Sequence, residues 1–153
     1  MASIVPGRMT VENESNIVVF LVGARINKWW LLPFAIPILS RMRKMQQELL
    51  SDPDSGLLAI QSLGSADVQY WKSAEHLMAY ASDSGRSHKP AWQAFYKKLF
   101  KNEAVGLWHE TYRASAGTYE SLYVNMPRFG LGKALALTRA EGSRKSIRQR
   151  LSA

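Results

Sequence analysis

The chain has 153 residues, of which 46% are hydrophobic and 21% charged, values typical of a single globular domain. It contains no Cys, which excludes disulfides, thiolate nucleophiles, zinc ribbons and iron–sulfur clusters, and is typical of a reducing compartment such as the cytoplasm. The net charge is +8, but residues 128–153 contribute +6 of it, so we do not expect direct nucleic-acid binding.

The first elements are an N-terminal extension and a strand. Residues 1–15 lack the continuous apolar core of a secretory signal, and we expect them to lie outside the domain. Residues 16–26, NIVVFLVGARI, are rich in β-branched side chains and predict a strand that is apolar on both faces.

The next segment, residues 29–39, reads WWLLPFAIPIL and is too short to span a membrane, which takes roughly 20 residues. Pro33 and Pro37 predict an irregular wall packed against the sheet, with peripheral membrane contact as the alternative. A helix is expected over residues 38–50, where apolar residues recur at helical spacing.

The middle of the chain predicts a hairpin and two further helices. Residues 56–63 and 67–71 read as short strands on either side of a Gly-containing turn. Ser73 is a candidate cap for a helix through Ala81, and residues 88–99 open a second helical piece with Pro90 in its first turn.

The last predicted element is a hairpin over residues 105–125, with Ala116-Gly117 as its turn. The order is then β-α-β-β-α-β-β, the α+β ferredoxin-like plan with one added strand, over residues 16–133. Residues 134–153 form a basic tail, flexible or helical, whose removal from Glu141 onward should leave the fold intact.

The topology predicts a partner. Two helices cover only one face of such a sheet, whereas the first strand is apolar on both. We therefore expect a homodimer in which two sheets pack across a two-fold axis and close an α/β barrel.

The 105–125 hairpin gathers polar and aromatic side chains and is the candidate ligand site. Alternation places His109 with Leu107 and Thr111 on one face, and Tyr112 with Trp108 and Glu110 on the other. On the returning strand Tyr119, Ser121 and Tyr123 share a face. Glu110 and Glu120 would lie on adjacent strands, as a carboxylate pair or in an edge salt bridge with Arg113.

Several segments carry a resemblance to a known family. They are PGRMT at residues 6–10, FLVGARINKWW, YWKSAEHLMAYA followed by HKPAW, VGLWHETY and YESLYVNMPRFGLG. In these the chain resembles the dimeric α/β-barrel superfamily of the antibiotic-biosynthesis monooxygenases, in the branch of small proteins similar to the monooxygenase of fumagillin biosynthesis. The resemblance covers about residues 5 to 133, and it implies an oxidoreductase of secondary metabolism.

Three functions remain open at this level. The first is a small monooxygenase-like enzyme acting on an apolar polyketide, terpenoid or phenolic substrate between sheet and helices. The second is a haem enzyme of the aldoxime-dehydratase type, with His109 or His88 as the axial ligand. The third is a non-catalytic or stress-response barrel that binds a hydrophobic ligand.

In the monooxygenase hypothesis His109 is the proton acceptor, because imidazole titrates near neutrality. Tyr112 or Tyr123 would hydrogen-bond the developing enolate oxygen. The expected substrate contacts are Trp92, Trp108, Tyr119, Asn125 and His88. His76 is expected on the surface.

The sequence favours a reaction that requires no cofactor, with haem as the alternative. The FGLGK segment lacks the nucleotide-binding pattern, so nicotinamide and ATP are not expected, and nothing supports flavin. No pair of His residues has metal-ligand spacing, so no metal site is predicted either.

Overall fold

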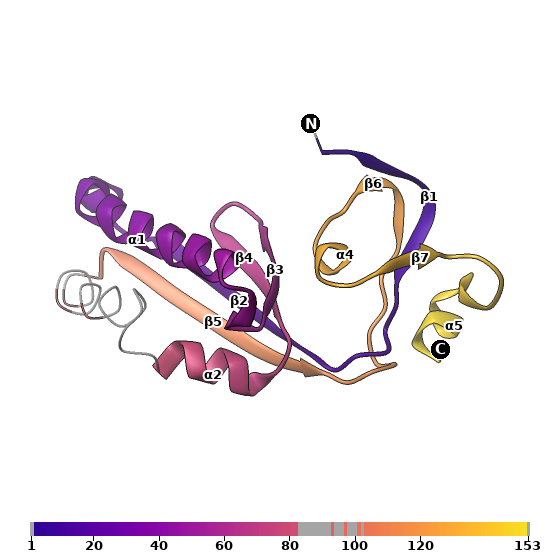
Figure 1. Ribbon diagram of the computed structural model, residues 1–153. Coiled ribbons are helices and arrows are strands. Elements are labelled where there is room, and N and C mark those ends of the chain that lie inside the picture. The colour runs from indigo at the N-terminus through magenta and orange to yellow at the C-terminus, as the bar shows by residue number, and fades with distance from the viewer. Residues whose placement is uncertain (1, 83–92, 94–96, 98–100, 102, 153) are drawn as a thin grey trace.

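The computed structural model describes residues 2–82, 93, 97, 101 and 103–152. Its strands form a four-stranded sheet of order β3-β4-β2-β5 and a three-stranded sheet of order β6-β1-β7 (Figure 1). The strands are β1 Ile4–Val11, β2 Ile17–Ile26, β3 Leu57–Ser62, β4 Ala66–Trp71, β5 Val105–Ala114, β6 Tyr123–Pro127 and β7 Leu137–Arg139. The helices are α1 Leu32–Ser51, α2 Ala74–Ser82, α4 Leu131–Ala134 and α5 Ile147–Leu151.

The larger sheet has one face packed against helices. Its core joins Val18 of β2 and Trp71 of β4 to Leu49 of α1, and the α2 residues Leu77 and Tyr80 pack against that cluster. Residues directly opposite each other in an antiparallel pair point to the same side. We call this side of the sheet the helix face and the other side the open face.

The larger sheet confirms the predicted ferredoxin-like α+β plan. β2 and β4 are central, β3 and β5 lie at the edges, and every pairing is antiparallel. The β3–β4 hairpin forms as predicted, and α2 begins just after Ser73, whose hydroxyl accepts a hydrogen bond from the His76 amide. The helix predicted over residues 88–99 lies outside the described residues.

The predicted hairpin of residues 105–125 is wrong. β5 pairs with β2 along its whole length, and β6 pairs with β1 in the other sheet. The chain turns at residues 115–118, where the Gly117 amide donates to the Asn13 carbonyl rather than to a returning strand. The Glu110–Glu120 pair expected from that hairpin is absent, because Glu120 instead binds Arg150.

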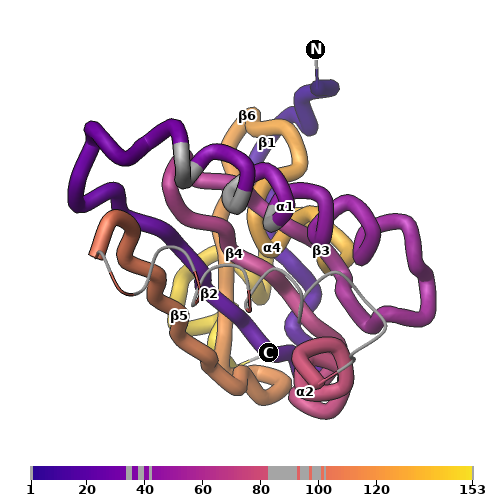
Figure 2. The backbone as a smooth tube through the Cα atoms, turned by 90° about the vertical axis from the view of Figure 1, so that its left-hand side faces the viewer, coloured from indigo at the N-terminus to yellow at the C-terminus, as the bar shows by residue number. Residues whose placement is uncertain are grey.

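The second sheet is built from both ends of the chain. β1 lies within the N-terminal residues expected as an extension, and β7 lies within the basic tail. β1 pairs antiparallel with β6 on one side and with β7 on the other. The three-stranded sheet lies behind the larger sheet in Figure 2.

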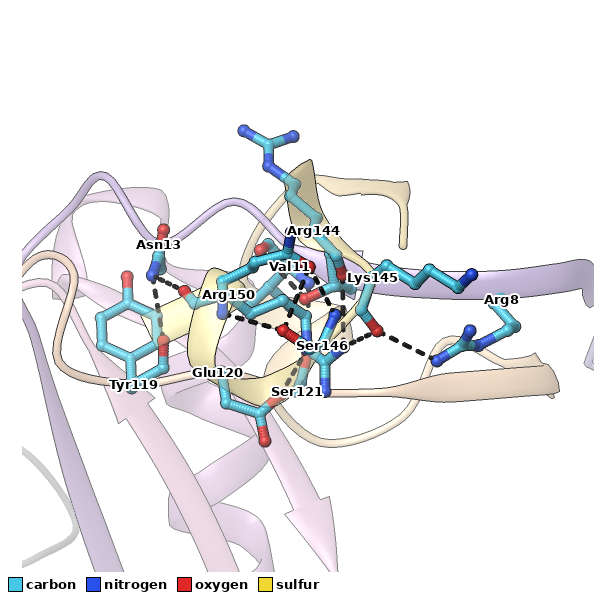
Figure 3. Close-up of polar contacts among 12 residues, drawn as sticks. Arg8, Val11, Asn13, Tyr119, Glu120, Ser121, Arg144, Lys145, Ser146 and Arg150 are labelled. Atoms are coloured by element: carbon cyan, nitrogen blue, oxygen red, sulfur yellow. Dashed lines mark hydrogen bonds and ion pairs between the residues drawn. The ribbon is translucent and has the colours of Figure 1, made fainter. Parts of the chain in front are cut away.

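The last helix, α5, docks on the chain through Arg150, which is 6% exposed. Its Nε donates to Glu120 Oε2 at 2.7 Å, and its Nη1 donates to the carbonyls of Arg144 and Lys145 (Figure 3). The Arg150 carbonyl accepts from Asn13 Nδ2 at 2.8 Å. We expected removal of the tail to leave the fold intact, and these contacts argue against that expectation.

Part of the open face is covered by α4 of the same chain. Gln61 of β3 accepts a hydrogen bond from the Gly130 amide at 3.2 Å, and the phenol of Tyr70 on β4 lies beside Gly130. Both Gln61 and Tyr70 lie on the open face by register. Toward β5 the same face is exposed, with Trp108 at 42% and Tyr112 at 53%.

The start of α1 also differs from expectation. Residues 29–31 form a 3₁₀ turn, and α1 begins at Leu32 with Pro33 in its first turn, where a missing N–H costs nothing. Pro37 is accommodated inside the helix. Trp29 and Trp30 are exposed rather than packed against the sheet, at 76% and 60%.

Candidate functional site

His109 lies on the helix face of the larger sheet, on edge strand β5. Its partner across β2 is Val22, and the same Val22 pairs on its other side with Asp67 of β4. Since β2 places Val18 and Phe20 on the helix face, Val22 and its partners point there too. The alternation predicted for His109 is thus confirmed.

The imidazole of His109 is free to react. The ring is exposed and lies 5.4 Å from the ring of Phe20, centroid to centroid, at an interplanar angle of 33°. In the part of the chain that the structure describes, neither ring nitrogen has a hydrogen-bond partner. His76, by contrast, is held by Ser73, whose Oγ lies 2.9 Å from His76 Nδ1.

The neighbours of His109 form an apolar floor with polar ends. Phe20 and Val22 belong to β2, the strand between β5 and β4. Phe20 pairs with Thr111 of β5 on one side and with Gln69 of β4 on the other. Adjacent strands lie about 4.8 Å apart, which puts the backbones of His109 and Asp67 roughly 10 Å apart across β2.

Asp67 is the polar group at the other end of this floor. Its Oδ2 accepts a hydrogen bond from Gln46 Nε2 of α1. Gln69 next along β4 is buried and accepts from Trp71 Nε1 at 3.0 Å. α1 therefore fixes the carboxylate from above the sheet, while His109 stays exposed.

Tyr112 and Trp108 do not join His109. Both point to the open face, where Tyr112 Oη donates to Glu110 Oε2 at 2.6 Å and the Trp108 ring lies against Gly23. The carboxylate of Glu110, as hydrogen-bond acceptor and as a negative charge, raises the pKa of Tyr112 above its ordinary value. An enolate bound near His109 is out of reach of this phenol.

Tyr123, Tyr119 and Asn125 lie in or beside the three-stranded sheet. Tyr123 Oη accepts from the Gly132 amide at 3.0 Å. Tyr119 Oη donates to the Ser15 carbonyl at 2.7 Å, and burial raises its pKa. Asn125 has a positive φ of 51° and its Oδ1 accepts from the Gly7 amide at 2.8 Å, where the β1–β6 register shifts.

The structure therefore does not bring together the three residues expected to act in catalysis. Tyr123 could hydrogen-bond a substrate at His109 only through the 105–125 hairpin, which does not form. Tyr112 follows His109 by an odd number of residues, which puts it on the opposite face. Of the expected substrate contacts, Trp92 and His88 lie outside the described residues.

Sequence reasoning missed Asp67, Gln69 and Phe20. In DVQYW the polar residues Asp67 and Gln69 alternate with Val68 and Tyr70, a period-2 signal that predicts one polar face. What the sequence does not reveal is that this polar face is the helix-covered one. Within the described ranges no three His, Asp or Glu side chains gather as a metal site.

A family model, monooxygenase af470-like, matches residues 17–131. The chain belongs to this family. It is also 29% identical over 157 residues to monooxygenase af470 of Aspergillus fumigatus, a match that covers 87% of this chain and 56% of that protein. The chain thus spans little more than half the length of the curated relative.

One of the similar solved structures supports the fold. The chain is similar to an aldoxime dehydratase crystallised in complex with butyraldoxime, with a TM-score of 0.60 and 17% identity, over 96% of this chain and 43% of that one. This coverage takes in both sheets. A conserved protein of unknown function from Bacteroides thetaiotaomicron matches 66% of this chain at a TM-score of 0.42 and 14% identity.

Proposed function

We propose that the chain is a small oxygenase that binds an apolar organic substrate on the helix face and uses His109 as its proton acceptor. The observation that carries the proposal is the free imidazole of His109, exposed above Phe20, in a member of a monooxygenase-like family. A free ring nitrogen is what a general base requires.

The reaction balances without a cofactor for a substrate with an acidic CH₂ group, such as a cyclic 1,3-diketone or the keto form of a phenol. His109 takes one proton from the carbon, and the carbanion passes one electron to O₂. The carbon radical and superoxide join as a peroxide, which takes up the proton. Loss of water then leaves a C=O group, so that substrate and O₂ become ketone and H₂O.

The polar ends of the floor support this assignment. Asp67 and His109 flank Val22 on the same face, so a planar substrate lying on Phe20 and Val22 meets a carboxylate at one end and an imidazole at the other. Asp67, fixed by Gln46, would accept a hydrogen bond from a substrate hydroxyl. That hydroxyl would orient the acidic carbon toward His109.

Oxygen uptake tests the proposal. With a panel of cyclic 1,3-diketones and phenols, His109→Ala should lose at least about a hundredfold in kcat/KM, as expected when a general base is removed. His76→Ala serves as the matched control, because that imidazole is already bound to Ser73, and should retain turnover. Equal turnover in wild type and His109→Ala would overturn the role of His109.

Haem binding is the second candidate, favoured by the same free nitrogen and by the fold shared with an aldoxime dehydratase. The donor set fits, since an exposed imidazole beside an apolar floor suits an axial ligand. Haem would supply redox chemistry that side chains lack. In that case His109 would hold the iron, and Phe20 and Val22 would supply apolar contacts to the porphyrin.

Titration with haemin separates the two candidates. A Soret band that His109→Ala abolishes would support the haem enzyme, whereas loss of the band only in His88→Ala would move the ligand to His88. Absence of both haem binding and oxygen uptake would leave a barrel that only binds a hydrophobic ligand.

A further inference from the structure

The 3₁₀ turn of residues 29–31 and the first turns of α1 expose a cluster of apolar side chains at one end of the molecule. Its members are Trp29, Trp30, Pro33, Ile36 and Pro37, which we call the tryptophan tip. Trp29 is 76% exposed, Trp30 60% and Ile36 55%. The two indoles meet edge to face, with centroids 6.1 Å apart. Exposed tryptophans on this scale mark a binding surface.

The position of the tip suits a flat partner. Figure 1 shows the beginning of α1 at the end of the molecule farthest from α5 and the sheet β6-β1-β7. The helical period puts Pro33, Ile36, Pro37, Arg41 and Lys44 on one side of α1, all of them exposed. An apolar first half is thus followed directly by a cationic second half on the same side.

The charge of the segment around the tip is positive. Residues 24–47 contain five Lys or Arg and no Asp or Glu. Arg25, Arg41, Arg43 and Lys44 are exposed, and Lys28 lies 3.7 Å from the carboxylate of Glu103. A surface of this kind attracts an anionic partner.

We propose that the tryptophan tip docks this protein on an anionic lipid surface. Trp is the residue that favours the membrane interface, where the indole body sits among acyl chains and its N–H reaches the headgroups. The flanking cations would meet the negative headgroups of the cytoplasmic leaflet. No described helix is long and apolar enough to cross a bilayer.

A second copy of the chain is a less favourable partner for the tryptophan tip than an anionic bilayer. A two-fold interface brings the same patch together on both sides, so the cations of one tip would face the cations of the other. Like charges opposed across an interface are strongly unfavourable. An anionic bilayer has the opposite charge and needs no groove to receive two indoles.

Co-sedimentation with vesicles tests the proposal. The full chain should bind phosphatidylcholine vesicles that contain 30% phosphatidylserine, and binding should weaken in high salt because the attraction is screened. Trp29→Ala/Trp30→Ala should lower the partition coefficient at least about tenfold. Met78→Ala, which removes an apolar side chain that is 56% exposed on α2, is the control and should bind as wild type.

Charge reversal and quenching complete the test. Arg41→Glu/Arg43→Glu should lose at least about tenfold in binding to the anionic vesicles, whereas Lys145→Glu/Arg148→Glu, at the other end of the molecule, should not. Lipids brominated in the acyl chains should quench the fluorescence of wild type but not of the double Trp variant. Unchanged vesicle binding by the double Trp variant would overturn the proposal, as would self-association that this variant abolishes.

Discussion

The phenols of Tyr123 and Tyr112 lie in different environments. Loss of their hydrogen bonds should therefore have different effects on the free energy of unfolding. Tyr123 Oη accepts from the amide of Gly132, which is buried, whereas Tyr112 Oη donates to an exposed carboxylate. Removing a hydrogen-bond partner is costly mainly where the other partner stays buried.

Tyr123→Phe should therefore lower the free energy of unfolding by about 1 kcal/mol, and Tyr112→Phe by less than about 0.5 kcal/mol. Urea denaturation of the two variants measures the difference. Equal losses would show that the hydrogen bond that the Gly132 amide also donates to the Phe129 carbonyl, at 3.0 Å, is sufficient for this amide.

Tyr70 provides a pH-dependent contribution to stability. Burial, and next the nearby Tyr123, raise the pKa of Tyr70 above its ordinary value of 10.0, and the hydrogen bond from the Leu131 amide opposes them. Below that ordinary value the phenol is neutral in both states. As the pH rises from there toward the raised pKa, the unfolded chain loses its proton first, and stability falls.

We expect the free energy of unfolding of the wild-type protein to decline between about pH 9.5 and pH 11, and to decline less steeply in Tyr70→Phe. Chemical denaturation at closely spaced pH values measures both slopes. Identical slopes would remove Tyr70 as a source of the decline.

At the level of single residues, the sequence predicts on which face of the sheet a side chain lies, but not which side chains of other strands lie beside it. Alternation correctly separates His109 from Tyr112. It does not reveal that β4 places Asp67 on the face of His109, because that requires the order of strands in the sheet. Ser73 as a cap was predictable, since its partner lies within one helical turn.

At the level of elements, α5 holds together two segments that link the sheets. Arg150 binds Glu120 in the 115–122 segment, while its carbonyl binds Asn13 in the 12–16 segment. α5 itself starts at a capping box between Ser146 and Gln149. Both connections therefore depend on this short helix.

Deletion of residues 141–153 should lower the free energy of unfolding by about 3 kcal/mol, because it leaves the Glu120 carboxylate without its buried partner. A chain ending at Leu151 retains the pair and should match wild type. Arg150→Ala should reproduce most of the loss, and Arg148→Ala, which alters an exposed side chain, should not. A truncated protein with the wild-type melting temperature would show that the tail is dispensable.

The 105–125 hairpin shows why pairing could not be predicted locally. A short Gly-containing turn between two alternating segments is the usual signature of a hairpin. Here the side chain of Asn16 and the carbonyl of Asn13 bind the amides of Ala116 and Gly117, and the chain leaves the sheet. The true partner of β6 is β1, more than a hundred residues away in sequence.

At the level of the whole molecule, the ferredoxin-like sheet was predictable because its strands and helices have clear periodicity and follow one another in the order of that plan. The second sheet was not, since β1 and β7 come from the two ends of the chain and are irregular in sequence. β1 carries Pro6-Gly7 and a register shift, and β7 has three residues.

The open face leads to the last prediction, which is a homodimer. Near β3 and β4 the chain covers this face with its own α4, but toward β5 it leaves Trp108 and Tyr112 exposed, beside the half-buried Val19 and Leu21. Exposed aromatic side chains around an apolar centre are typical of an interface core. We expect a second copy to cover this part of the face, sheet against sheet.

Sedimentation velocity at micromolar concentration should then show a dimer for the wild-type protein. Tyr112→Glu should weaken it at least about tenfold, because a carboxylate is poorly tolerated in the centre of an interface. Trp29→Glu, at the tryptophan tip, is the matched control: it adds the same charge far from the open face and should leave the dimer intact. A wild-type protein that stays monomeric would show that this aromatic surface is covered by something other than its own copy.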